Sequence, residues 1–226
     1  MIPQIMIKQH PAQMYLATAR KQRQTKGYNC WSTLSIENYQ EKTKDLGSLF
    51  LFNYQILAPH QKSTMLAQAD CLYYILPLYG GIEYQNKLIA TEKIEQIVSN
   101  KETSFEVSNP FDENMSFLQI GFKTNEPSLE NKSLEFDFKE KNKLISLFKN
   151  NTANAFIAQF DGRKEVHYQL QNKENGIFVY IINGAFEFEN RLLESGDALS
   201  LKETEDLEWE SLSENAMLLL IEIPLA

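Results

Sequence analysis

Histidine and cysteine are scarce in this chain of 226 residues, which holds three histidines and two cysteines. Two cysteines cannot build a disulfide scaffold or a cysteine-rich zinc site, and free thiols suit a reducing compartment. The histidines stand far apart, at positions 10, 60 and 167. The chain therefore lacks the clustered imidazoles and thiolates from which most transition-metal sites are built.

Positive charge and long apolar runs are also lacking. The 22 Lys and Arg residues are outnumbered by 30 Asp and Glu, and the formal charge of −8 argues against a nucleic-acid partner. The longest apolar run, residues 71–79, contains Pro77 and is too short to span a bilayer. Residues 1–13 contain no unbroken apolar stretch of a signal peptide. We expect a soluble cytoplasmic protein that binds neither nucleic acid nor membrane.

Apolar residues make up 43% of the chain, which is enough to form a core, and most of them lie in segments typical of β-strands. Aromatic and aliphatic runs or alternating segments recur at roughly the 8–12-residue spacing of a sandwich or barrel. In the first half they cover residues 49–57, 71–76, 93–98, 104–107 and 115–122. This pattern predicts an all-β fold with few short helices, of which residues 140–148 are the best candidate.

The pattern restarts after a polar stretch, residues 123–133, which is the best candidate linker. Residues 176–190 read as two strands joined at Asn183–Gly184, a strong hairpin signal because both residues tolerate positive φ. In each half a long apolar strand ends in a glycine, Gly80 or Gly184, and a short alternating strand follows. The two halves therefore predict a duplicated small β-barrel.

Four segments in this order resemble motifs of the pirin-like bicupins, which are quercetin dioxygenase-like cupins. They are residues 26–39, 49–59, 117–120 and 176–197, although Gly121 stands where the family's FLQIW pattern has tryptophan. The resemblance implies two cupin-type jelly-roll barrels in one chain. We place the first domain at residues 1–124, a linker at 125–133 and the second domain at 134–226.

The resemblance also implies where a metal would lie. Metal-bearing pirins hold a transition metal in the first barrel with three histidines and one glutamate. An ungapped match puts those four positions on Leu66, Gln68, Phe105 and Val107, none of which is a histidine or glutamate. We therefore expect no metal cofactor, and we interpret these four positions as the lining of a ligand pocket.

Three hypotheses on function follow. The first is a non-enzymatic protein that binds a small molecule or a protein partner, with His60, Asp70 and Glu106 at the rim of its pocket. The second is a metal-dependent, quercetin 2,3-dioxygenase-like oxidoreductase that uses His60, Asp70 and Glu106 as a non-standard ligand set. The third is metal-free catalysis in the same pocket, for which the sequence offers no nucleophile with a neighbouring base.

Overall fold

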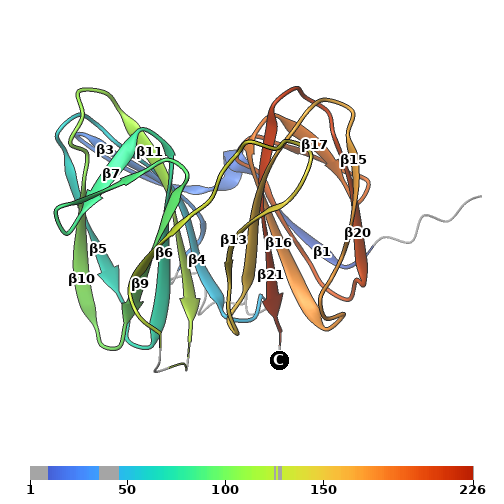
Figure 1. The fold of residues 1–226 in the computed structure, drawn as a ribbon, viewed down its shortest axis with the longest axis horizontal. Helices are drawn as coiled ribbons and strands as arrows, with labels where there is room; N and C mark the ends of the chain where they lie inside the picture. The colour runs from blue at the N-terminus through green and yellow to red at the C-terminus, as the bar shows by residue number, and fades with distance from the viewer. Residues whose placement is uncertain (1–9, 36–45, 125, 127–128, 226) are drawn as a thin grey trace, which may run out of the picture.

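The computed structural model describes residues 10–35, 46–124, 126 and 129–225, and this part of the chain is dominated by β-strands (Figure 1). Its one helical element is the 3-10 turn η1 (Ala17–Ala19). The helix expected over residues 140–148 is wrong, because Ile145–Lys149 form strand β13. A segment this short is a marginal helix, whereas pairing with a neighbouring strand buries Leu147 and Phe148 in the core.

The first domain is a barrel made from two facing sheets. A seven-stranded sheet has the order β12-β9-β6-β11-β4-β3-β2, and a four-stranded sheet has the order β5-β10-β7-β8. The strands of the large sheet are β2 (Lys21–Thr25), β3 (Tyr28–Leu34), β4 (Leu49–Leu57), β6 (Cys71–Tyr79), β9 (Lys93–Ser99), β11 (Met115–Lys123) and β12 (Lys132–Glu135). Those of the small sheet are β5 (Lys62–Ala67), β7 (Gly81–Tyr84), β8 (Lys87–Ala90) and β10 (Thr103–Ser108).

The second domain repeats this plan. Its six-stranded sheet has the order β1-β19-β16-β21-β14-β13, and its four-stranded sheet has the order β15-β20-β17-β18. The large sheet contains β1 (Ala12–Tyr15), β13, β14 (Asn154–Phe160), β16 (Asn175–Asn183), β19 (Ala198–Leu201) and β21 (Ala216–Pro224). The small sheet contains β15 (Glu165–Gln169), β17 (Ala185–Phe188), β18 (Arg191–Glu194) and β20 (Asp206–Ser211).

The two halves match in strand order except for β2, which has no counterpart in the second domain. The order β9-β6-β11-β4-β3 corresponds to β19-β16-β21-β14-β13, and β5-β10-β7-β8 corresponds to β15-β20-β17-β18. The edge strands β12 and β1 also take equivalent places, beside β9 and β19 respectively. The predicted duplication of a small β-barrel is confirmed by this topology.

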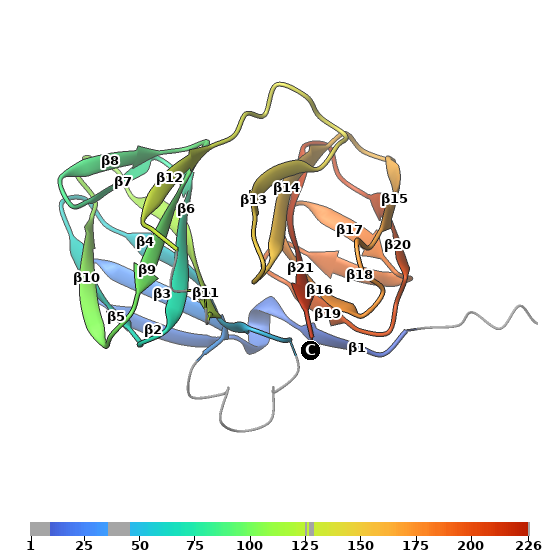
Figure 2. The ribbon, with the colours of Figure 1, turned by 60° about the horizontal axis from the view of Figure 1, so that its bottom comes forward.

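The sheets do not follow the predicted domain boundaries. Strand β1 was assigned to the first domain, yet it pairs with β19 of the second (Figure 2). Asp197 of the second domain also holds the segment that follows β1, because its Oδ1 accepts a 2.7 Å hydrogen bond from the Ala17 N–H. Strand β12 overlaps the predicted linker and pairs with β9 of the first domain. Short polar strands carry little apolar pattern, so the sequence could not assign either one to its sheet.

The predicted hairpin at Asn183–Gly184 is wrong in one respect. The two strands exist, but β16 pairs with β19 and β21 whereas β17 pairs with β18 and β20. Gly184, with φ of +80°, therefore turns the chain from one sheet of the barrel to the other. Two-residue hairpin turns lie instead at Lys26–Gly27, Gln85–Asn86 and Glu189–Asn190, and all four residues of the last two turns have positive φ.

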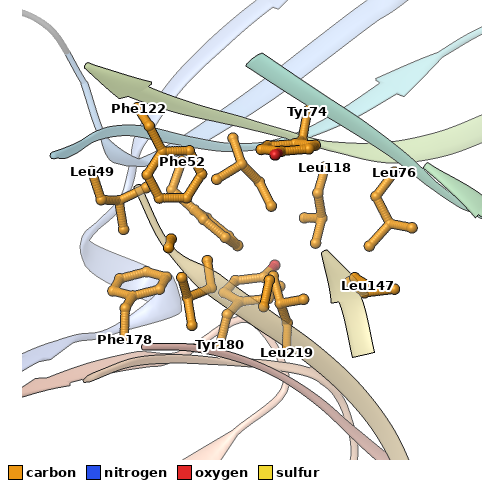
Figure 3. Packing of buried hydrophobic residues seen from close by; sticks show 14 of the residues in the cluster. Leu49, Phe52, Tyr74, Leu76, Leu118, Phe122, Leu147, Phe178, Tyr180 and Leu219 are labelled. Atoms are coloured by element: carbon orange, nitrogen blue, oxygen red, sulfur yellow. The ribbon is translucent and has the colours of Figure 1, made fainter. Parts of the chain in front are cut away.

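The domains pack through their large sheets. Alternate residues of β4, β6 and β11 point away from the first barrel and meet apolar side chains from the second domain's large sheet (Figure 3). The ring of Tyr74 stacks on Phe148 with centroids 3.7 Å apart, and Phe52 contacts Phe178 and Tyr180 at 4.9 and 4.8 Å. The long strands therefore have two buried faces, which explains their nearly continuous apolar sequence.

Among the described residues, no helix has the length and apolar character that crossing a bilayer requires. The end of the first family-like segment, residues 36–39, lies outside the described residues.

Candidate functional site

The interior of the first barrel is where the sequence places a ligand pocket, and β5 and β10 supply one of its walls. Phe105 pairs with Met65 and Val107 pairs with Ser63 across these antiparallel strands. Because side chains alternate along a strand, the inward set on β5 is Ser63, Met65 and Ala67, all buried. Phe105 and Val107 are buried with them.

Leu66 does not belong to this interior. It is 77% exposed because it stands between Met65 and Ala67 on the outward face of β5. Gln68 follows the end of β5 and is half-buried, and its N–H donates a 2.9 Å hydrogen bond to the Tyr73 hydroxyl. The ungapped match is therefore out of register with the inward face of β5, and a one-residue slip moves every side chain to the opposite face.

Aromatic rings occupy the barrel beside Met65. Phe105 lies 6.0 Å from the Tyr73 ring and 5.8 Å from the Tyr84 ring, and Phe50 meets Tyr73 edge-on at 6.0 Å. A Cβ at Gly121, where the family pattern has tryptophan, would lie 3.0 Å from the Phe50 ring. Gly121 thus leaves room for the rings that fill this part of the barrel.

The three residues expected at the rim do not come together. His60 lies in the β4–β5 turn and Asp70 in the β5–β6 turn, so strand β5 separates them. Six residues of strand span about 20 Å. Glu106 faces outward from β10 and forms a 2.9 Å ion pair with Lys62. His60, Asp70 and Glu106 therefore cannot ligate one metal ion, and the hypothesis of this ligand set is wrong.

The donor chemistry of the barrel also does not fit the metal that the resemblance implies. The inward residues of β5 and β10 offer one hydroxyl, one thioether, a methyl group, an aromatic ring and a branched aliphatic side chain. Iron and nickel sites of this kind need imidazole and carboxylate donors. Across the described ranges, no three His, Cys, Asp or Glu residues are grouped so that they could hold a metal ion.

A row of buried amides on the opposite wall was not predicted. Gln55 on β4 accepts a 2.8 Å hydrogen bond from the Tyr28 hydroxyl and donates one of 2.6 Å to Gln119 on β11. Asn53 donates to the same Gln119 oxygen at 3.3 Å. The signal in the sequence was three amide residues at inward positions of otherwise apolar strands. These hydrogen bonds join the three amides, although the buried Asn53 Oδ1 has no hydrogen-bond partner among the described residues. Amides do not replace the missing imidazoles.

Tyr28, Tyr73 and the Cys71 thiol of the first barrel are not activated nucleophiles. Burial raises the pKa of Tyr28 to about 12 and also raises the pKa of Tyr73. Burial likewise raises the pKa of the Cys71 thiol. All three groups therefore stay protonated near neutral pH, and a protonated thiol is a poor nucleophile. These groups lend no support to metal-free catalysis.

Aromatic side chains occupy the second barrel as well. Trp209 stacks on Phe188 with centroids 5.2 Å apart, and Phe160 meets both Trp209 and Phe186 edge-on at 6.3 and 6.0 Å. All four side chains are essentially inaccessible to solvent. His167 lies on the exposed face of β15, opposite Glu208, and contributes nothing to this interior.

A groove lies at the end of the first barrel, where β6 ends and β11 begins. It has a volume of about 400 Å³ and is lined by Tyr79, Gly80, Phe111, Asp112, Glu113, Asn114 and Met115. The Tyr79 hydroxyl donates a 2.9 Å hydrogen bond to Glu113, which raises the pKa of Tyr79. His60, expected at a pocket rim, lies 2.8 Å from Asp112 of this groove.

Comparison with known proteins agrees with this architecture. Residues 139–223 match the family described as the quercetinase C-terminal cupin domain. No curated protein matches the chain. Among solved structures, YhhW from Escherichia coli superposes with a TM-score of 0.83 at 14% identity, over 96% of this chain and 99% of that one.

Two further structures are similar over most of their length. The nickel(II) complex of the bacterial pirin YhhW from Escherichia coli has a TM-score of 0.82 at 15% identity, covering 96% of this chain and 100% of that one. Quercetin 2,3-dioxygenase from Acinetobacter baumannii has a TM-score of 0.76 at 11% identity, covering 97% and 88%. At such identities the likeness establishes the fold, two cupin jelly rolls, and leaves the chemistry to the residues of this chain.

Proposed function

We propose that this pirin-like bicupin acts by binding a partner and does not carry out metal-dependent oxygen chemistry. The observation that carries the proposal is the inward face of β5 and β10. It presents Met65, Ala67, Phe105 and Val107 where a metal-bearing relative needs nitrogen and carboxylate donors.

The proposal places the contacts with the partner on the outer surface. Buried side chains occupy both barrel interiors, with Tyr73 and Phe105 in the first and Phe188 and Trp209 in the second. A molecule of flavonol size could enter the first barrel only by displacing several of these rings, at a cost of several kcal/mol each if they are left unpacked. The four positions expected to form a pocket are therefore reassigned: Phe105 and Val107 to the core, Gln68 to a strand end and Leu66 to the surface.

The same proposal keeps the cytoplasm as the expected location. Cys30 and Cys71 are buried free thiols, which suits a reducing compartment. The partner is a small molecule or a protein, and no cofactor is required for binding.

Incubation with quercetin in air tests the proposal. The full chain is mixed with the flavonol in the presence of Fe(II), Ni(II), Mn(II), Co(II), Cu(II) or no added metal, and loss of flavonol absorbance is followed. The expected rate equals that of the metal without protein. A protein-dependent rate that saturates with quercetin in the presence of any of these metals would overturn the proposal.

A further inference from the structure

We infer that the groove between Tyr79 and Phe111 is a docking site for an arginine side chain of a partner protein. The inference rests on the proposed function, because it names the kind of partner that a binding protein of this shape would take. It is argued from the walls of the groove, its charge and the way in which its loop is held.

The walls of the groove are two exposed aromatic rings. Tyr79 is 58% exposed and Phe111 is 40% exposed, although large aromatic side chains elsewhere in the domain are mostly buried. Met115, which is 1% exposed, also lines the groove. Aromatic rings are enriched at interfaces, and exposed apolar groups gathered in one hollow are typical of a recognition surface.

The charge of the groove is negative. Asp112 and Glu113 line it, and its lining includes no Lys or Arg. The Asp112 side chain is 97% exposed, and its 2.8 Å contact with His60 lies at the surface, where such contacts contribute little. Because Asp112 Oδ2 and the second oxygen of Glu113 are not used in the contacts with His60 and Tyr79, both carboxylates have acceptors to offer.

The buried side chain of Asn109 fixes the loop that carries Phe111, Asp112 and Glu113 through hydrogen bonds. Asn109 is 1% exposed, and its Nδ2 lies within 2.7 to 3.1 Å of the carbonyl oxygens of Leu57, Ala58 and Glu113. Its Oδ1 accepts a 3.0 Å hydrogen bond from the N–H of Phe111. A loop fixed in this way loses little conformational entropy when a partner binds.

Arginine fits these features better than other side chains. Its guanidinium is planar, so it can stack on the Tyr79 or Phe111 ring while its fork of N–H groups donates to a carboxylate. Lysine is a point charge without this planar face, and a purely apolar side chain would give Asp112 and Glu113 no further hydrogen bond. The groove opens at the surface, so a side chain on a protein loop can reach it.

The test is an NMR titration of the uniformly ¹⁵N-labelled full chain with N-acetyl-arginine amide, which mimics an arginine residue within a protein. N-acetyl-citrulline amide has nearly the same shape without the charge and serves as the matched ligand. We expect shifts confined to amides of the groove, such as those of Gly80, Phe111 and Asn114. The citrulline compound should bind about tenfold more weakly, because it loses one charge-assisted contact.

Variants test whether the groove itself is responsible. Asp112→Asn and Phe111→Ala should each reduce binding of the arginine compound several-fold. Asp137→Asn and Leu192→Ala, at exposed positions that do not line the groove, should leave binding unchanged. Equal binding of the two compounds, shifts outside the groove or no effect of Asp112→Asn would overturn the inference.

Free L-arginine distinguishes the source of the ligand. It carries an extra carboxylate and ammonium group that a protein side chain lacks. Tighter binding of free arginine than of the capped compound would overturn the assignment to a protein partner. Because flavonol turnover is assayed without any arginine compound, failure of the proposed function and failure of this inference are separate results.

Discussion

Truncation of Phe105 to alanine tests whether the first barrel is a packed core. The side chain is 9% exposed and lies between the rings of Tyr73 and Tyr84, opposite Met65. Phe→Ala changes in a core cost about 3–5 kcal/mol, of which the cavity left behind is a large part. Because Phe105 stands at the margin of its cluster, we expect the lower end of this range, about 3 kcal/mol.

Equilibrium urea denaturation followed by far-UV circular dichroism measures the change. With a slope of about 3 kcal/mol per molar urea, the midpoint of the transition should fall by about 1 M. Phe111→Ala is the matched control, because it deletes the same ring six residues away at a position that is 40% exposed. It should change stability by less than about 1 kcal/mol.

A loss below about 1 kcal/mol for Phe105→Ala would refute the reasoning, because a ring inside a packed core cannot be removed so cheaply. Such a result would mean that the ring borders an open pocket, and the pocket hypothesis would return. An equal loss of unfolding free energy for Phe105→Ala and Phe111→Ala would show that the solvent exposure of the ring does not determine the cost of removing it in this domain.

Three further predictions concern buried polar groups. Burial raises the pKa of Tyr28 from 10 to about 12. The contribution of the protonated Tyr28 hydroxyl to the free energy of unfolding is therefore complete below pH 10 and is lost as the pH rises to 12. Urea denaturation midpoints should accordingly fall between pH 9 and 12. Glu222 is wholly buried and accepts hydrogen bonds from the Asn175 side chain and the Tyr168 hydroxyl. Glu222→Ala should therefore cost at least about 3 kcal/mol by urea denaturation, and a cost equal to that of an exposed glutamate would contradict this. Asn109→Ala should speed hydrogen exchange of the Phe111 amide, measured by NMR, whereas unchanged exchange would show that Asn109 does not hold the loop.

The sequence predicted the long strands well because their signal is strong and local. The apolar run at residues 49–57 coincides with β4, and the run beginning at Cys71 is β6. Both strands bury two faces, one in the first barrel and one against the second domain, so they read as continuous hydrophobic segments. The repeat of long and short strands in each half then predicted the duplication.

The turns were harder to predict because the same residues serve different purposes. Asn183–Gly184 has the composition of a hairpin turn, but it turns the chain between two sheets. Two of the observed hairpin turns, Gln85–Asn86 and Glu189–Asn190, place a Gln or Glu at positive φ, where the usual preference is for Asn, Asp or Gly. Strand partners far away in the sequence decide which turn is which.

The prediction of the pocket lining was wrong on β5 because the predicted positions are one residue out of register with the inward face of that strand. The absence of a histidine within β5 and β10 could be read directly from the sequence. Which residues point inward could not, because that depends on the pairing of Phe105 with Met65 across two strands. No sequence pattern indicated the groove at Tyr79 and Phe111, because its lining comes from two chain segments, residues 79–80 and 111–115, that only the fold brings together.

The metal content of the purified full chain tests the central claim most directly. The protein is produced in medium supplemented with iron, nickel, manganese, copper and zinc, dialysed, and analysed for all five elements against its own concentration. The account predicts far less than one metal ion per chain for every element. A ratio close to one for any of them, reduced by replacing an inward residue of β5 or β10, would contradict it.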